Sequence, residues 1–517
     1  MSGAVELSAP QATSSEERRS LDAIDVDFRA LALRDLADAA FEEASAGGAS
    51  RTSVRVHRVR RGELRLRDGR LVSNEETTSN GVAVQVVLDG TCGFAADGDL
   101  APPTAAAVAG AALETARLSR PLAAEPYELA DEPVHRDAVW VSSYELDPFA
   151  VDDAEKAALL ADWSGRLLAA ASVDHVYAKL VAVRETVFYA DSAGTSTLQQ
   201  RVRLYPQLLA VSSRGGRAET MRTLGPPSGR GWEYVHGDGW DWDSELAAIP
   251  DLLAEKARAA PVEPGTYDLV LDPTNLWLTL HETVGHPTEL DRVLGSEAGF
   301  AGTSFPGSER LGELRYGSRA MNVTGDRTAE HGLATVGYDD EGVAAQEWDI
   351  VRDGVLVGYQ LDRATTRRVG APRSNGCAYA DSAAHVPMLR MANVSLRPAP
   401  GGASTEELVS DVERGIYVVG DDSFSIDTRR LDFQFTGQRF YRIRRGRLAG
   451  QVRGVAYRSS TPAFWRSLAA VGGPETYLLM GADYCGKGQP GQIAAASHGC
   501  PAALFRDVRV LDTGREA

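Results

Sequence analysis

The stretch that decides how this chain must fold is His281-Glu282-Thr283-Val284-Gly285-His286. Two imidazoles flank a glutamate that directly follows the first of them. This arrangement is typical of a hydrolytic metal site on a helix, with neutral nitrogen ligands and a carboxylate that can take a proton from water. The common motif of this kind spaces its histidines four residues apart, whereas here they are five apart. The additional residue constrains the local backbone.

A regular α-helix cannot accommodate this spacing. Five residues turn such a helix by about 500°, so the two rings would lie roughly 140° apart and could not share a metal ion. A local π-type turn, which closes on five residues, would bring them together, and so would a helix that ends inside the motif. Gly285 loosens the backbone, and Pro287 disfavours α conformation at His286. We therefore predict a helix that begins at Asp272-Pro273, an N-cap and first-turn pair, and breaks between Gly285 and Pro287.

Two histidines leave a zinc-type site short of a third protein ligand. Cys485 follows an apolar run and enters a glycine-rich loop with a nearby lysine, a suitable place for a thiolate. A lone cysteine is, however, more often a small core residue. Glu289 and Asp291 could instead reach the metal or support its histidines from behind. The residues alone leave these alternatives open, and the full set of polar candidates is Glu289, Asp291, Cys377, His385, Cys485 and His498.

The composition is that of a globular protein with more than one domain. The chain has 517 residues, of which 43% are hydrophobic and 24% charged, too many residues for one core and an ordinary balance for a folded protein. The formal net charge of −18 makes a poor surface for phosphate backbones, so no nucleic-acid partner is expected. No apolar run reaches the length of a membrane span and the N-terminus does not resemble a signal peptide, so we expect a cytoplasmic protein without a membrane partner.

The pattern along the chain predicts an α+β fold in three parts. Residues 1–20 are expected to be disordered. Residues 21–260 alternate strands with helices near 102–118, 152–171 and 243–260, which predicts an N-terminal α/β domain. Residues 261–517 contain short alternating strands and Gly/Asp turns. They predict a β-rich, barrel-like antiparallel C-terminal domain that carries the metal helix.

The metal motif and several other segments, taken in order, resemble the TldD/PmbA family of metallopeptidases. Beside residues 280–286 with Glu289 and Asp291, the matching segments are 67–70, 81–84, 354–359, 387–393, 414–417 and 485–490. The resemblance therefore extends over nearly the whole chain. One departure is Pro287, which stands where the family usually has glycine.

The resemblance implies the roles of the site residues. His281 and His286 are expected to bind one metal ion, normally zinc, and Cys485 to complete the protein ligands. Glu282 matches the catalytic glutamate. His385 and His498 are further candidates for substrate binding. The family also implies a homodimer, or a heterodimer with a paralogue that lacks the metal motif, and substrates that are unfolded proteins or linear peptides.

The expected activity is zinc-dependent hydrolysis of peptide bonds by metal-activated water, with Glu282 as the general base. One alternative is a non-catalytic, metal-stabilised scaffold or a regulatory subunit of a peptidase complex. Glu282 distinguishes this alternative, because a purely structural site has no use for an adjacent base. Another alternative is a metal-dependent hydrolase of a non-peptide amide, which would use the same residues.

Overall fold

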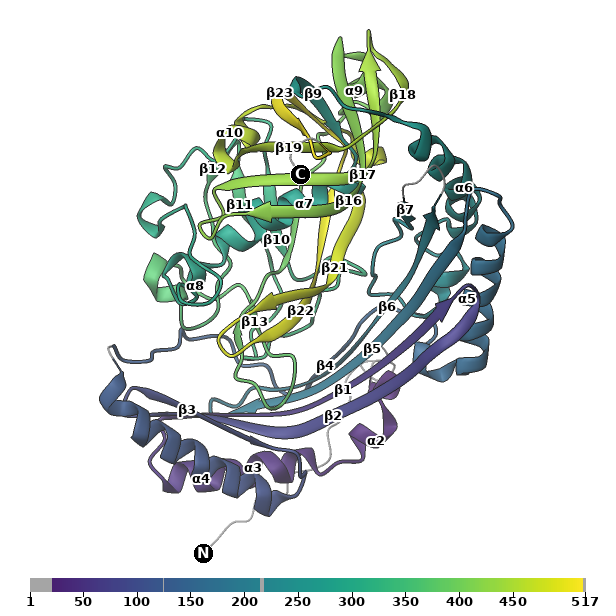
Figure 1. Ribbon diagram of the computed structural model, residues 1–517. Helices are drawn as coiled ribbons and strands as arrows, with labels where there is room; N and C mark the ends of the chain where they lie inside the picture. The colour runs from purple at the N-terminus through teal and green to yellow at the C-terminus, as the bar shows by residue number, and fades with distance from the viewer. Residues whose placement is uncertain (1–20, 124, 214–217, 515–517) are drawn as a thin grey trace, which may run out of the picture.

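A strongly bent sheet of long strands forms the first half of the molecule (Figure 1). The computed structural model describes residues 21–123, 125–213 and 218–514, so the predicted disorder of residues 1–20 lies outside the described residues. The strand order is β3-β2-β1-β5-β6-β4, with β7 beside β6. The strands are β1 (Arg51–Arg67), β2 (Arg70–Leu88), β3 (Thr91–Asp97), β4 (Ala138–Val141), β5 (His175–Asp191), β6 (Ser196–Ser212) and β7 (Glu219–Arg222).

Helices cover the outer face of this sheet. Side chains alternate along a strand, and even-numbered apolar residues of β1 such as Val54 and Leu66 pack against helices. One group of helices covers one end of the long strands and a second group covers the other end (Figure 1). The helices are α2 (Val26–Arg29), α3 (Leu33–Ala46) and α4 (Pro102–Ser119) at one end, and α5 (Asp153–Leu168) and α6 (Trp242–Arg258) at the other.

The inner face of the sheet is polar and lies against the C-terminal half. On this face Arg55 of β1 pairs with Asp340 at 3.2 Å, and Arg203 of β6 pairs with Asp483 at 3.0 Å. Both pairs are largely buried. The even-numbered residues of these strands pack against the helices. The odd-numbered residues point to the opposite face and therefore join the two halves of the molecule.

A closed five-stranded barrel organises the C-terminal half. Its order is β16-β9-β23-β19-β17, and β17 pairs back with β16 to close the ring, which leaves no open edge within the ring. All of these pairings are antiparallel except that of β9 with β16, which is parallel. The strands are β9 (Gly265–Leu271), β16 (Arg414–Ile426), β17 (Asp432–Arg444), β19 (Val455–Ser460) and β23 (Ala503–Asp512).

Shorter elements surround the barrel. β8 (Ala260–Pro261), β18 (Arg447–Arg453) and β20 (Leu468–Val471) extend the barrel sheet. β10 (Val323–Asp326), β11 (Glu347–Arg352), β12 (Val355–Leu356) and β15 (Asn393–Leu396) form a four-stranded sheet, and β13 (Ala378–Tyr379) pairs with β14 (Met388–Leu389). β21 (Leu478–Lys487) and β22 (Gln492–Cys500) form a hairpin. The helices of this half are α7 (Pro273–Leu280), α8 (Leu290–Val293), α9 (Thr405–Ser410) and α10 (Thr461–Arg466).

The helix α7 is fixed against the barrel, and each of its residues is buried. Asp272 caps its first turn, as predicted. The Asn275 amide donates to the carbonyls of Gly420 in β16 and Thr436 in β17, both at 2.9 Å. The Tyr457 hydroxyl of β19 donates to the Asn275 side-chain oxygen at 2.9 Å. One side chain therefore ties the metal helix to three barrel strands.

The predicted α+β fold with a β-rich barrel in the C-terminal half is confirmed. The parallel pairing of β9 with β16 departs from the all-antiparallel arrangement expected. In the N-terminal half the strands are antiparallel apart from β4 with β6, and the helices cover the outer face of that sheet. The domain division at residue 261 stays a prediction. Among the described residues, no helix is long and apolar enough to cross a membrane.

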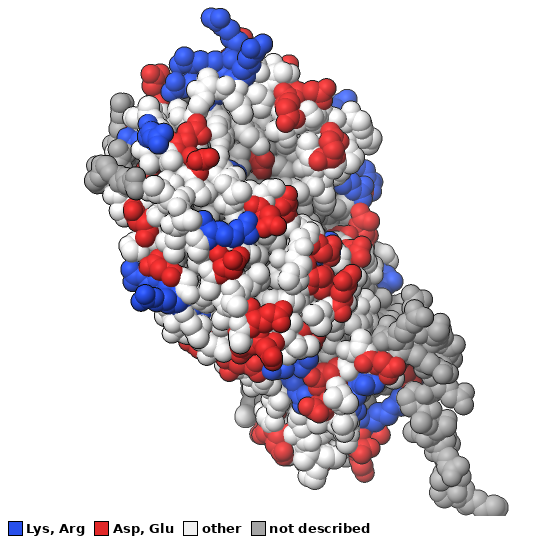
Figure 2. Space-filling model, turned by 90° about the vertical axis from the view of Figure 1, so that its right-hand side faces the viewer, with Lys and Arg blue, Asp and Glu red and all other residues white. Residues whose placement is uncertain are grey.

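The surface charge agrees with the acidic composition. Acidic side chains are spread over most of the face that Figure 2 presents, and a large basic cluster lies at one end of it. This face therefore offers no broad basic surface of the kind that binds phosphate backbones.

Candidate metal centre

A π turn resolves the five-residue spacing of the motif. Residues His281–Gly285 form this turn directly after α7, and a 3-10 turn follows over His286–Thr288. The ring centroids of His281 and His286 lie 4.7 Å apart. The expected helix break is wrong in one respect: His286 keeps right-handed helical torsions, φ −61° and ψ −43°, despite the proline that follows.

A side chain supplies the hydrogen bond that the proline removes, and a second side chain satisfies the next carbonyl along the chain. Pro287 has no N–H to donate to the Thr283 carbonyl four residues earlier, and the Tyr316 hydroxyl donates there instead at 2.5 Å. The Thr288 hydroxyl donates to the Val284 carbonyl at 2.7 Å. Since these buried carbonyls are satisfied by side chains, the chain can stay helical through the proline.

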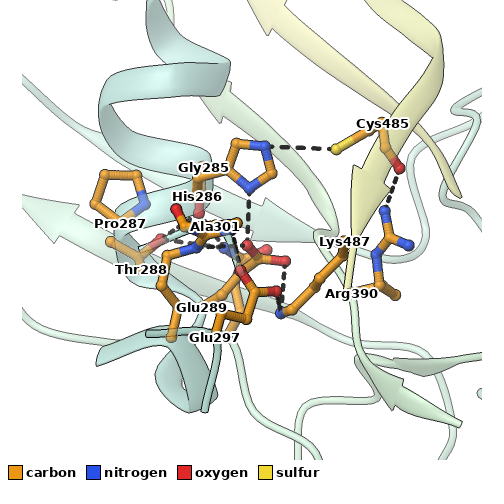
Figure 3. Close-up of polar contacts among 12 residues, drawn as sticks. Gly285, His286, Pro287, Thr288, Glu289, Glu297, Ala301, Arg390, Cys485 and Lys487 are labelled. Carbon is orange, nitrogen blue, oxygen red and sulfur yellow. Dashed lines mark hydrogen bonds and ion pairs between the residues drawn. The ribbon is translucent and has the colours of Figure 1, made fainter. Parts of the chain in front are cut away.

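The structure brings His281 and His286 together with Cys485 of β21 (Figure 3 shows His286 and Cys485). Each residue offers one ligand atom, and these atoms lie within 4.8 Å of one another, the only such group among the described residues. Cys485 Sγ lies 3.5 Å from His286 Nε2, across 199 positions of sequence. All three residues are buried.

Hydrogen bonds orient both imidazoles toward the thiol. His498 Nδ1 faces the Val394 carbonyl at 2.8 Å, and a carbonyl oxygen only accepts, so His498 carries its hydrogen there. His498 Nε2 then accepts from His281 Nδ1 at 2.7 Å. His286 Nδ1 donates to Glu289 at 2.8 Å (Figure 3). In both histidines the Nε2 lone pair is left for a metal ion.

The surroundings favour the protonation states that bind zinc. Burial lowers the pKa of His281 and of His286 below the ordinary 6.5, which favours the neutral rings. Burial alone raises the pKa of the Cys485 thiol, but His286 and then Arg390 outweigh it, and the pKa falls below 9.0. A donor set of two neutral imidazoles and one thiolate fits zinc with one coordination position left open.

Glu282 lies beside this group but is not one of its three ligand residues. Its carboxylate is buried and forms an ion pair with the guanidinium of Arg430, which comes from the turn between β16 and β17. A carboxylate next to the ligands but outside the ligand set is the arrangement that a general base requires.

Among the remaining sequence candidates, Glu289, Asp291 and His498 lie around the ligands rather than among them, and the buried Cys377 thiol contacts Asn375 instead. Glu289 supports His286, as anticipated, and Asp291 contacts Lys487 at 2.9 Å and reaches the histidine only through that lysine and Glu289. His498 is fully buried behind His281. The His385 ring bonds to Asp381 at 2.6 Å and makes no hydrogen bond to the ligand residues described here; its substrate-binding role stays a prediction.

Sequence reasoning missed two charged residues at the site. Arg430 is 148 positions from Glu282, and no local pattern marks it. Lys487 was noticed only as a neighbour of the cysteine. It extends instead to Glu289 at 3.1 Å, beneath His286 (Figure 3). Alternation along β21 gives a signal for the second residue, because positions 485 and 487 share one face of the strand.

Two models of one protein family match this chain. A family model described as the PmbA/TldA metallopeptidase C-terminal domain matches residues 264–512, and the model of domain 1 matches residues 52–116. Together they span more than half of the chain. This chain belongs to the TldD/PmbA family. The resemblance inferred from the sequence segments is thereby confirmed.

Individual proteins are also similar to this chain. A metalloprotease of Methanothermobacter thermautotrophicus is 27% identical over 505 residues, which cover 95% of this chain and 100% of the relative. A zinc metalloprotease TldD homolog of Saccharolobus solfataricus is 27% identical over 277 residues, covering 53% and 58% of the two chains. The structure of TldE from Thermococcus kodakarensis superposes with a TM-score of 0.68 at 14% identity, covering 92% of this chain and 99% of TldE.

Proposed function

We propose that this chain is a zinc-dependent peptidase that hydrolyses peptide bonds in unfolded proteins or linear peptides. The observation that supports this most directly is the site itself, where three zinc-type ligand atoms meet beside a carboxylate outside the ligand set. A structural zinc site uses four protein ligands and has no need of a base, whereas a catalytic site has three protein ligands and an open position.

The residues divide the chemistry among them. Zinc, when bound, supplies a Lewis acid that lowers the pKa of water to about 7 and polarises a carbonyl group. His498 and Glu289 hold the two imidazoles in place. Glu282 accepts the proton of the attacking water and returns it to the leaving amine nitrogen. Burial of the ligand residues limits the access of bulk water and strengthens these electrostatic interactions.

Replacing Glu282 with glutamine tests the catalytic role. The Glu282→Gln variant is expected to keep about one zinc ion per chain, as in structural and catalytic zinc sites generally, and to lose cleavage of an unfolded protein or a linear peptide. The matched control is Glu313→Gln, at an exposed glutamate without a side-chain partner among the described residues. Cleavage by Glu282→Gln at the rate of the unaltered protein would exclude Glu282 as the base.

Replacing Cys485 tests the ligand set. The Cys485→Ser variant is expected to lose zinc, because serine is a poor zinc ligand at neutral pH. Undiminished zinc in this variant would transfer the third-ligand role to Glu289 or Asp291. The alternative of a metal-stabilised scaffold or regulatory subunit would be favoured if the unaltered protein holds zinc but cleaves no peptide, whether alone or with a paralogue. Cleavage of small non-peptide amides alone would favour the second alternative.

Two further parts of the proposal concern assembly and location. We propose a dimer, either of two copies of this chain or with a paralogue that lacks the metal motif, acting in the cytoplasm. Light scattering on the purified chain, alone and after coexpression with such a paralogue, measures the assembly. A chain that stays monomeric under both conditions contradicts it.

A further inference from the structure

Arg430 places a positive charge at the metal centre that metal binding does not explain. Its Nη1 pairs with the Glu282 carboxylate, and the arginine side chain is 14% exposed. Burial and then the charge of Arg430 lower the pKa of both His281 and His286, whereas Glu282 raises that of His281 and Cys485 raises that of His286. A cation this close to the ligand residues repels a divalent metal ion. Its position is therefore explained by negative charge outside the ligand set, of which Glu282 is one source in the resting site.

The turn that carries Arg430 is held by its backbone and not by its side chain. Arg430 has a positive φ of 58°. Its N–H donates to the Asp427 carbonyl at 3.0 Å, and its carbonyl accepts from the Thr461 hydroxyl at 2.8 Å. The Asp427 carboxylate accepts from the Leu431 N–H at 2.7 Å. The guanidinium is thus free for a task other than supporting the turn.

The other cations near the ligands are already engaged by buried partners. Arg390 donates to the carbonyls of Cys485 and Gln492. Lys487 and Arg292 pair with buried carboxylates beneath His286. Arg390, Lys487 and Arg292 are each at most 1% exposed, so a substrate cannot reach them. Arg430 differs, because its side chain is partly exposed and Glu282 is its only side-chain partner among the described residues.

We propose that Arg430 is a further catalytic residue, whose guanidinium binds the scissile carbonyl oxygen of the peptide and stabilises the negative charge that develops there. This inference rests on the proposed peptidase function. The ion pair with Glu282 aligns the guanidinium in the resting site. An N–H of the guanidinium that Glu282 does not use then donates to the substrate.

The step balances with the residues at hand. The water oxygen bonds to the carbonyl carbon, the water proton moves to Glu282, and the carbonyl π electrons move onto the oxygen that Arg430 contacts. When the carbonyl re-forms, the C–N bond breaks and Glu282 returns its proton to the leaving nitrogen. Arg430 donates a hydrogen bond and transfers no proton, since an arginine guanidinium keeps its charge in proteins. A fixed donor aimed at a developing oxyanion is worth about 10²–10³ in kcat.

The test compares Arg430→Ala, Arg430→Gln and Arg430→Lys with Arg429→Ala. Arg429 is the exposed neighbour on the same turn, with no side-chain partner among the described residues, and serves as the matched control. For Arg430→Ala and Arg430→Gln we expect full zinc content, a kcat lower by about 10²–10³ and a much smaller change in KM. Arg430→Lys, which keeps the charge, should recover part of the loss, and Arg429→Ala should match the unaltered protein.

Inhibitor binding separates a catalytic from a structural role. A phosphinic peptide places a negative charge where the carbonyl oxygen would carry it. Its affinity should fall in Arg430→Gln by about the same factor as kcat, while a neutral ground-state peptide binds nearly as before. Equal or faster cleavage by Arg430→Ala and Arg430→Gln overturns the proposal and makes the ion pair a resting lock on Glu282. An unaltered protein that cleaves no peptide instead overturns the peptidase function itself.

Discussion

Lys487 lies 3.1 Å from one carboxylate oxygen of Glu289, and the other oxygen accepts from His286 at 2.8 Å. A buried lysine is thus connected to a candidate metal ligand through one shared carboxylate. Burial alone lowers the pKa of Lys487, but Asp291, Glu289 and then Glu297 raise it above 10.5. The lysine is therefore charged, and it neutralises an acidic cluster that would otherwise repel itself beneath the metal site.

Removal of that lysine should destabilise the protein. In Lys487→Met the carboxylates of Glu289, Asp291 and Glu297 lose their shared cation, and we expect the free energy of unfolding to fall by about 3–5 kcal/mol at neutral pH. Burial already raises the pKa of Asp291 and of Glu297, and without Lys487 these values should rise further and that of Glu289 should rise with them, so the folded variant binds more protons as the pH falls. The deficit should shrink between about pH 8 and pH 5.5.

Urea unfolding of the metal-free protein at both pH values measures this effect. The control is Lys156→Met: Lys156 is also buried, but its partner Asp153 is 49% exposed, and we expect a loss below about 1 kcal/mol. A deficit for Lys487→Met that is equal at the two pH values would show that lost packing, and not charge, is responsible.

His498 should control how tightly zinc is held, although it does not reach the site. It fixes which nitrogen of His281 carries the hydrogen. In His498→Ala that constraint is lost, and we expect zinc affinity to fall by about 10- to 100-fold. Titration against a competing chelator measures it, with His385→Ala as the control, since that ring bonds to Asp381 instead. Unchanged affinity in His498→Ala would mean that packing alone orients His281.

The sequence predicted the parts of the site that follow from local geometry. The five-residue spacing of His281 and His286 left two backbone solutions, and the structure uses the π turn. The pair Asp272-Pro273 was correctly placed at the start of the helix. The helical torsions of His286 were not predictable, because they depend on the Tyr316 hydroxyl, which is 33 positions away from the carbonyl it contacts.

Site residues that are brought together only by tertiary contacts could not be identified from the sequence pattern. Cys485 was one of six candidates until the family resemblance selected it, and its position beside His286 depends on β21 packing near α7. Arg430 carries no signal at all, since an arginine in a turn between two strands is ordinary. The barrel itself was predicted from the alternation of apolar and polar residues. The parallel pairing of β9 with β16 was not, because it depends on the order of the strands in space, about which that alternation gives no information.

Gly285 should tolerate no side chain while Met391 stays in place. A Cβ at this position would stand 2.5 Å from Met391 Sδ, closer than packed atoms allow. We expect Gly285→Ala to displace the π turn, to cost about 1–3 kcal/mol of unfolding free energy and to weaken zinc binding. The double variant Gly285→Ala with Met391→Ala restores the space and should recover zinc binding in part. A double variant that binds zinc no better than Gly285→Ala would locate the requirement in the backbone torsions.

His57 should make the fold sensitive to mild acid. It is 1% exposed on the inner face of β1, and neither ring nitrogen has a hydrogen-bond partner among the described residues. Burial and then the charge of Arg55 lower its pKa below 6.5. The charged groups that face it are Arg55, Asp340, Glu185 and Arg201.

The sign of the effect follows from proton binding. Below pH 6.5, the ordinary value for histidine, the unfolded chain binds a proton at position 57 that the folded chain does not, so the free energy of unfolding falls as the pH falls. The slope from this one group approaches about 1.4 kcal/mol per pH unit. His57→Leu removes it, so the variant should gain stability relative to the unaltered protein between about pH 7.5 and pH 5.5. Urea unfolding at the two pH values measures the gain, and an equal difference at both would exclude His57 as the group that titrates.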